Sequence, residues 1–99
     1  MLTITAVIRV KDGSDRVMRE ALLEVAEHAR ANELGTVGFF VSQDVADPRV
    51  FTTYERFASQ AAMDLHNNSA VVARFFNIAK PILDGDVTLV TSSELSAKA

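Results

Sequence analysis

Two ionisable side chains near the middle of the chain could carry out proton chemistry. His66 ends a short stretch of helical spacing that begins at Ser59, and an imidazole is well suited to accept a proton near neutral pH. Glu55 alternates onto the same strand face as Phe51 and Phe57, so its carboxylate is expected among aromatic rings. A carboxylate in such surroundings needs a polar partner. His66 and Glu55 are therefore the candidate catalytic residues.

Each of these two residues also has a structural interpretation. His66 could cap the carbonyl groups at the end of its helix or bond to a neighbouring side chain. Glu55 could form a structural ion pair with Arg9 or another basic group, because buried carboxylates are usually paired. In the functional interpretation, Glu55 orients His66 or binds a substrate hydroxyl. The sequence leaves both interpretations open.

Phenylalanines could supply a binding site for a flat ligand. The spacing of the aromatic residues allows an apolar slot, although such residues are more often part of a core. The candidates for this slot are Phe57, Phe75 and Phe76, together with Phe39 or Phe40.

Polar substrate contacts are also predicted. Asn67 and Asn68 interrupt the helical region and could donate hydrogen bonds to a substrate oxygen, although a turn explains them equally well. We include Asn68 among the candidate binding residues. Arg9 is included as well, because its guanidinium could stabilise a developing oxyanion.

Several classes of partner and cofactor are disfavoured. The net charge is −3 and no stripe of Lys or Arg is visible, so neither nucleic acid nor a membrane surface is expected as a partner. The chain has no cysteine, and His28 and His66 lack the spacing of a metal site, so no metal is expected. Nucleotide-binding glycine motifs are missing. The start of the sequence resembles a strand more than a signal peptide, which makes the cytoplasm the expected compartment.

Alternating and helical patterns predict the elements that must position these residues. The 99 residues are expected to form one domain, 1–99. A strand over 2–10 is followed by a helix that Ser14 could cap, which runs to Asn32, with Gly35 available beyond its end. Further strands are predicted over 36–44, 49–57 and 86–93. Between the last two lies a broken helical region, in which Ser59 and Ser69 are the caps and Pro81 marks the end.

This order, β-α-β-β-α-β, predicts an α+β fold of the ferredoxin-like kind, with one antiparallel sheet and helices on one side. The other face of the sheet then carries Val7, Phe40 and Tyr54, or the residues that alternate with them. Such a face is too apolar to remain in water. A homodimer in which a second copy covers it is therefore expected.

The block from Phe51 to Ser69 contains the pattern F-x-x-Y-E-x-F-x-S-x-x-A-M-x-x-H-x-x-S. It resembles the strand and helix pattern of the antibiotic biosynthesis monooxygenase (ABM) family, and the similarity extends more loosely over nearly the whole chain. The resemblance implies a dimeric α/β barrel that uses O2 on a phenolic or quinol small molecule without any cofactor, with a histidine at the pocket. Many members have tryptophan where this chain has Phe57, and the chain contains no Trp.

The family resemblance leaves two further functions open. Some relatives with this fold are isomerases of a small phosphorylated sugar-like molecule, for which a pocket lined by Arg, Lys and Asn is expected. A dimeric domain that binds a small apolar ligand without catalysis is the other alternative. Haem-degrading relatives are a poorer match, because their ligand histidine falls where this chain has Phe75 or Phe76, which cannot bind iron.

Overall fold

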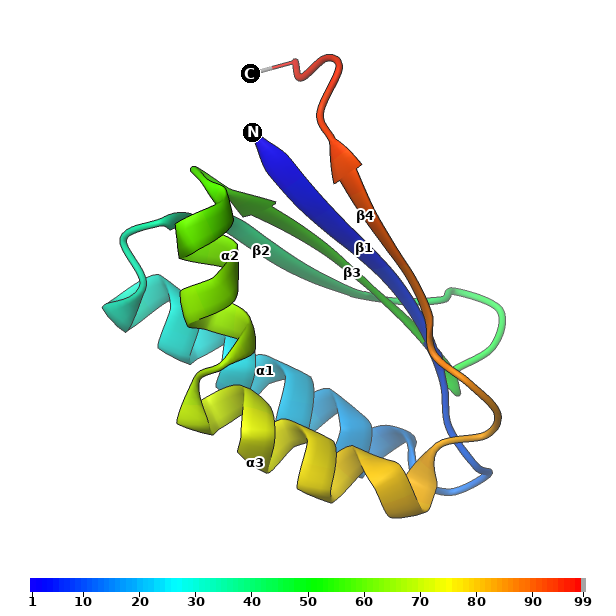
Figure 1. Ribbon diagram of the computed structural model, residues 1–99. Helices are drawn as coiled ribbons and strands as arrows, with labels where there is room; N and C mark the ends of the chain where they lie inside the picture. Colours follow the sequence, from blue (N-terminus) through cyan, green and yellow to red (C-terminus); the bar gives the residue numbers. More distant parts are fainter. Residues whose placement is uncertain (99) are drawn as a thin grey trace.

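Four antiparallel strands form one sheet, and the helices pack against one of its faces (Figure 1). The computed structural model describes residues 1–98. The strands follow the order β2-β3-β1-β4 across the sheet. The elements are β1 (Leu2–Arg9), α1 (Asp15–Asn32), β2 (Thr36–Gln43), β3 (Val50–Phe57), α2 (Gln60–Asn67), α3 (Ala70–Ala79), the 3₁₀ turn Lys80–Ile82 and β4 (Thr88–Ser93). The predicted α+β, ferredoxin-like architecture is confirmed.

The inner face of the sheet carries the residues that face the helices. Along β3 this face holds Phe51, Thr53, Glu55 and Phe57, all of them buried. Phe51 belongs to a core cluster with Met18 and Leu22 of α1, and Phe57 belongs to a second cluster under α2. Two polar residues therefore lie between two apolar clusters on the same strand, which places Glu55 inside the protein.

The broken helical region begins each of its segments with a serine cap, as predicted. The hydroxyl oxygen of Ser59 accepts a hydrogen bond from the backbone N–H of Ala62 at 3.1 Å, and that of Ser69 accepts one from Val72 at 3.3 Å. Each cap satisfies a backbone donor that the first helical turn leaves without a partner. The break between α2 and α3 lets α2 cross one end of the sheet while α3 lies beside α1 (Figure 1).

Two predictions about the ends of α1 were wrong. Ser14 precedes α1, but its side chain makes no capping hydrogen bond. Gly35 does not end the helix with a left-handed residue, because Glu33 ends it in an extended conformation with φ of −115°. A Cβ atom at Gly35 would lie 2.5 Å from Cβ of Ala62. The glycine is thus explained by the close approach of the α1–β2 connection to α2.

The outer face of the sheet is open in the monomer. Phe40, Tyr54 and Val90 lie in one row of the register, with Thr5 between the last two, and are 56 %, 38 % and 50 % exposed. At one end of this face, Glu94 accepts hydrogen bonds from the Tyr54 hydroxyl at 2.6 Å and from the Arg56 guanidinium at 2.7 Å. These bonds hold the pKa of Glu94 down at about 2. Among residues 1–98, no helix has the length and apolar character needed to span a bilayer.

Candidate active site

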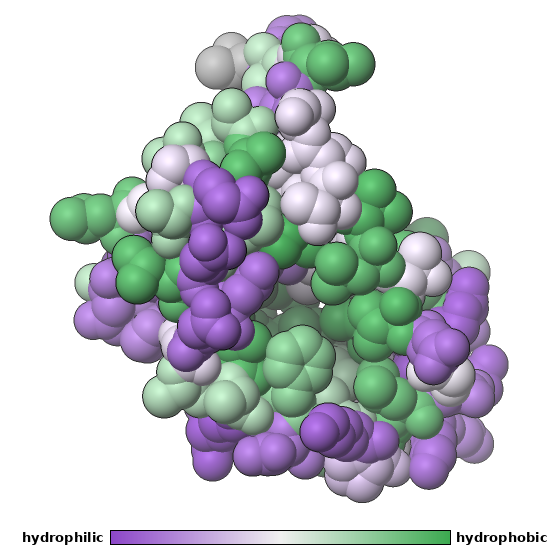
Figure 2. Space-filling view, in the orientation of Figure 1, coloured by the Kyte–Doolittle hydropathy of each residue, from purple (hydrophilic) through white to green (hydrophobic). Residues whose placement is uncertain are grey.

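A cavity of about 270 Å³ lies between the inner face of the sheet and the helices. Figure 2 shows an opening surrounded mainly by apolar side chains. Phe76 of α3 and Leu89 of β4 line the cavity and are 47 % and 57 % exposed, which places them near its mouth. The wall is apolar except for Thr53, Glu55, His66, Asn67 and Thr91. Such a cavity suits a small and largely apolar ligand that carries a few polar groups.

His66 is held inside the protein by its neighbours. The residue is 3 % exposed, and its ring lies 5.4 Å from that of Phe39 and 5.3 Å from that of Phe57, measured between centroids. The predicted capping role does not apply to the ring, whose nitrogen atoms face two carboxylates. The backbone carbonyl of His66 instead accepts the Ser69 hydroxyl at 2.7 Å.

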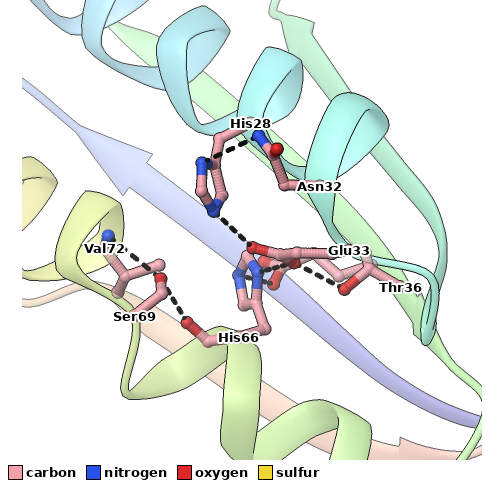
Figure 3. Close-up of polar contacts among 8 residues, drawn as sticks. His28, Asn32, Glu33, Thr36, His66, Ser69 and Val72 are labelled. Atoms are coloured by element: carbon pink, nitrogen blue, oxygen red, sulfur yellow. Dashed lines mark hydrogen bonds and ion pairs between the residues drawn. The ribbon is translucent and has the colours of Figure 1, made fainter.

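Two carboxylates approach His66 from different parts of the fold, and Figure 3 shows the one from Glu33. Nδ1 lies 2.7 Å from Oε1 of Glu33, at the end of α1, and Nε2 lies 3.4 Å from Oε1 of Glu55, on β3. Each carboxylate is also held by a threonine. Thr36 donates to Oε1 of Glu33 at 2.6 Å, and Thr53 donates to Oε2 of Glu55 at 2.8 Å. The imidazole therefore has a fixed orientation, with its Nε2 side toward the cavity residue Glu55.

The surroundings of His66 act on its pKa in opposite directions. Burial of the ring lowers the pKa, and hydrogen bonds with Glu55 and Glu33 raise it together with the charges of these carboxylates. The net result is a pKa above the ordinary value of 6.5. His66 therefore keeps its proton to a higher pH than a free imidazole does.

The structure brings together four of the seven predicted site residues around the cavity. His66, Glu55, Phe75 and Phe76 line its wall. Phe57 is completely buried and packs against the ring of His66, and it is not part of the cavity wall.

Arg9 and Asn68 are placed elsewhere. Arg9 is exposed on the outer face of the sheet. The alternative of an ion pair between Arg9 and Glu55 was therefore wrong, because Glu55 on the inner face contacts Thr53 and His66. Asn68 donates to the backbone carbonyl of Asp64 at 2.8 Å and so ends α2, whereas Asn67 lines the cavity. We therefore leave Arg9 and Asn68 out of the proposed site.

Glu33 was not among the predicted site residues, although it makes the shortest polar contact with the His66 ring. The two residues are 33 positions apart, and no periodic pattern connects the end of α1 with α2. The local signal was a carboxylate two residues before Gly35, the glycine that permits the close approach of α2. Within residues 1–98, no group of three or more His, Cys, Asp and Glu side chains is arranged to hold a metal ion.

A match to a family model decides the family of this chain. The model of antibiotic biosynthesis monooxygenases matches residues 1–77, which include β1 to α2 and most of α3. The chain belongs to the ABM family. The resemblance predicted from the block at residues 51–69 is confirmed. No functionally curated protein matches this ABM-family chain in sequence.

Solved structures share the ABM fold over nearly the whole chain. A Nitrosomonas europaea protein that bears the same family name is 21 % identical, with a TM-score of 0.90, and the match covers 97 % of this chain and 100 % of that one. The Pseudomonas aeruginosa protein PA3566 is 25 % identical, with a TM-score of 0.86 and coverage of 96 % and 94 %. Rv0793 from Mycobacterium tuberculosis is 17 % identical, with a TM-score of 0.89 and coverage of 99 % and 98 %. At such identities, these similarities support the fold.

Proposed function

We propose that this ABM-family chain is a monooxygenase that acts with O2 on a small phenolic or quinol molecule, without a cofactor. The observation that carries the proposal is the Glu55–His66 pair in the wall of an otherwise largely apolar cavity. An apolar wall suits a flat ring, and the pair is the place where a hydroxyl proton can be received. The cavity also excludes bulk water from most of a bound ring, which favours reaction over side reactions.

The proposed reaction begins with proton transfer from the substrate hydroxyl to the Glu55–His66 pair. The resulting phenolate is electron-rich and can pass an electron to O2. The superoxide so formed then combines with the ring radical at a carbon that bears hydrogen. One oxygen atom stays on the ring as a carbonyl, and the other leaves as water with two hydrogens of the substrate. All four electrons come from the substrate, so a phenol and O2 give a quinone and water.

The protein contributes position and proton transfer to this reaction. Phe75 and Phe76 offer aromatic faces on α3, and Asn67 offers an amide at the end of α2. The side chain of His66 is 4 % exposed and that of Glu55 is 10 % exposed, so the pair is fixed before the substrate arrives. Fixed polar groups need little reorganisation when charge develops on the substrate.

The open outer face of the sheet supports a homodimer as part of the proposal. Phe40, Tyr54 and Val90 are exposed on a face that the chain's own helices leave uncovered (Figure 1). Pairing with a second copy would bury these side chains and make the dimeric α/β barrel that the family resemblance implies.

The test is oxygen uptake with a panel of dihydroxynaphthalenes and menadiol, under air and without oxygen. We expect oxygen-dependent conversion to a quinone by the wild type, slowed about 10²–10⁴-fold in His66→Ala. Leu65→Ala is the matched control, because Leu65 is the preceding residue of α2 and is 77 % exposed. Equal rates in wild type and His66→Ala would remove His66 from the reaction, and no conversion of any panel member would favour a ligand-binding protein.

The isomerase alternative receives less support from the cavity. A phosphate-binding pocket is expected to contain Arg or Lys, but the lining contributed by residues 1–98 contains neither. Turnover of a phosphorylated sugar-like substrate without oxygen would reverse this preference.

A further inference from the structure

Glu33 connects the buried histidine to the surface of the protein. Its Oε1 contacts His66, whereas its Oε2 is buried without a hydrogen-bond partner among the described residues and lies 3.4 Å from Nε2 of His28 (Figure 3). The His28 side chain is 36 % exposed, and its Nδ1 lies 3.4 Å from the amide nitrogen of Asn32. Glu55, His66, Glu33 and His28 thus form a continuous line of titratable groups from the cavity to solvent.

A proton received at the cavity while substrate fills the mouth can leave along such a line. Burial separates the ring of His66 from water, and between its two carboxylates it already tends to hold one proton. The ring of His66 can accept a proton in each new turnover only if the proton from the previous one has been removed. Among residues 1–98, the cavity wall contains no titratable side chain besides Glu55 and His66.

Other charged groups nearby are engaged elsewhere. His66 is faced by Glu33 from the end of α1 and by Glu55 from β3, and His28 is faced by Glu33. The neighbouring carboxylates on α1 are bound to arginines at the surface. Glu27 pairs with Arg30, and Glu24 pairs with Arg74 at 2.7 Å. Glu33 is therefore the carboxylate that connects the two histidines.

We propose that Glu33 and His28 form a proton exit from the active site. The Nδ1 proton of His66 passes to Oε1 of Glu33 while Nε2 receives the proton that arrives from the cavity. Rotation of the Glu33 carboxyl group about its terminal C–C bond then brings this proton to the position facing His28. Nε2 of His28 accepts it, which requires the neutral ring to carry its own proton on Nδ1 and the Asn32 amide to present its oxygen there. Nδ1 then releases that proton to water. No electron moves. His66 and His28 are each left with a proton on Nε2, so both rings must turn over before the path accepts the next proton.

The exit path rests on the proposed function only for the origin of the proton, so it can be tested without turnover. The chain has two histidines, which makes their ring signals easy to assign in ¹⁵N-histidine NMR spectra. The measurement is the rate at which the His66 ring proton exchanges with water. We expect this exchange to be slower by about tenfold or more in His28→Asn than in the wild type, because the surface acceptor is removed.

Two variants complete the experiment. Glu33→Gln should slow the exchange as well, because a neutral amide cannot take up and release the proton. Glu20→Gln is the control, since Glu20 is an exposed carboxylate of α1 that pairs with Arg16. In this variant the His66 ring proton should exchange at the same rate as in the wild type. Equal exchange in wild type and His28→Asn would overturn the exit path. His28→Asn changes a half-exposed side chain, so its folding is not expected to limit the test.

The rate of oxygen consumption provides a second test of the exit path. If the wild type consumes oxygen with a quinol, His28→Asn should be slower in dilute buffer, and added imidazole should restore its rate. A slow rate that imidazole does not restore would contradict the exit path. If the wild type consumes no oxygen, the proposed function fails while the NMR result still decides the exit path.

Discussion

The ring of His66 makes its closest polar contact with Glu33, with 2.7 Å between Nδ1 and Oε1, although the two residues come from different parts of the fold. This contact fixes which ring nitrogen faces the interior of the fold and which faces the cavity. It also depends on the close packing of the α1–β2 connection against α2. The site is therefore a product of how these two segments meet, and several measurements can test this.

The first prediction concerns stability and pH. The pKa of His66 lies above its ordinary value of 6.5 in the folded protein, so the folded state binds this proton more tightly than the unfolded state does. The resulting stabilisation is fully present below the unfolded pKa and is lost as the pH rises through the folded pKa. His66→Gln should lower the free energy of unfolding by about 1–3 kcal/mol at pH 6, and by less at pH 9. Urea unfolding at both pH values measures this, and a difference that grows with pH would contradict it.

The second prediction concerns the contact between Gly35 and Ala62. A methyl group at Gly35 would meet Cβ of Ala62 at 2.5 Å, so Gly35→Ala must push α2 away from the end of α1. We expect a loss of about 1–3 kcal/mol in the free energy of unfolding. Adding Ala62→Gly removes the opposing atom and should restore part of the loss. Additive effects of the two changes would show that the contact is not responsible.

The third prediction concerns the mouth of the cavity. Phe76→Ala removes an aromatic wall that is half exposed, so ligand binding should suffer more than folding. An aromatic contact contributes about 0.5–1.5 kcal/mol, which corresponds to a dissociation constant raised roughly 2–10-fold for a dihydroxynaphthalene. Calorimetric titration without oxygen measures this. Leu65→Ala removes a similarly apolar side chain outside the cavity and should bind as the wild type does.

The fourth prediction concerns the open face of the sheet. Val90 is half exposed on β4, an edge strand of that face, and a carboxylate there would be costly to bury against a second copy. The wild type should sediment as a dimer at micromolar concentration, and Val90→Asp should shift it to the monomer. Leu23→Asp changes an exposed position of α1 and should remain a dimer. A monomeric wild type would refute the dimer.

The fifth prediction concerns Tyr54, which is the single tyrosine of the chain. The phenol donates a hydrogen bond to Glu94, and this bond, with burial and the nearby charge, raises the pKa of Tyr54 above 10.0. Loss of the bond in Glu94→Ala should bring the pKa of Tyr54 down toward that value. Ultraviolet titration of the phenolate measures it without interference, because the chain has no tryptophan. An unchanged titration would show that the bond is absent in solution.

Much of the fold could be predicted from local patterns. Alternation of apolar and polar residues placed Glu55 on the inner face of β3. Ser59 and Ser69 marked the starts of two helices. Both patterns depend only on residues that are close together in the chain. The block at residues 51–69 also indicated the family. The sequence by itself thus determined the order of elements and the two candidate catalytic residues.

Tertiary structure decided which groups meet. Glu33 joins His66 because the connection after α1 packs against α2, and Arg9 lies away from the cavity because its position on β1 turns it to the outer face. Local periodicity describes the face of one element, whereas a contact between distant residues depends on how several elements pack together. The partner of the histidine and the path from it to His28 were therefore visible only in the folded protein.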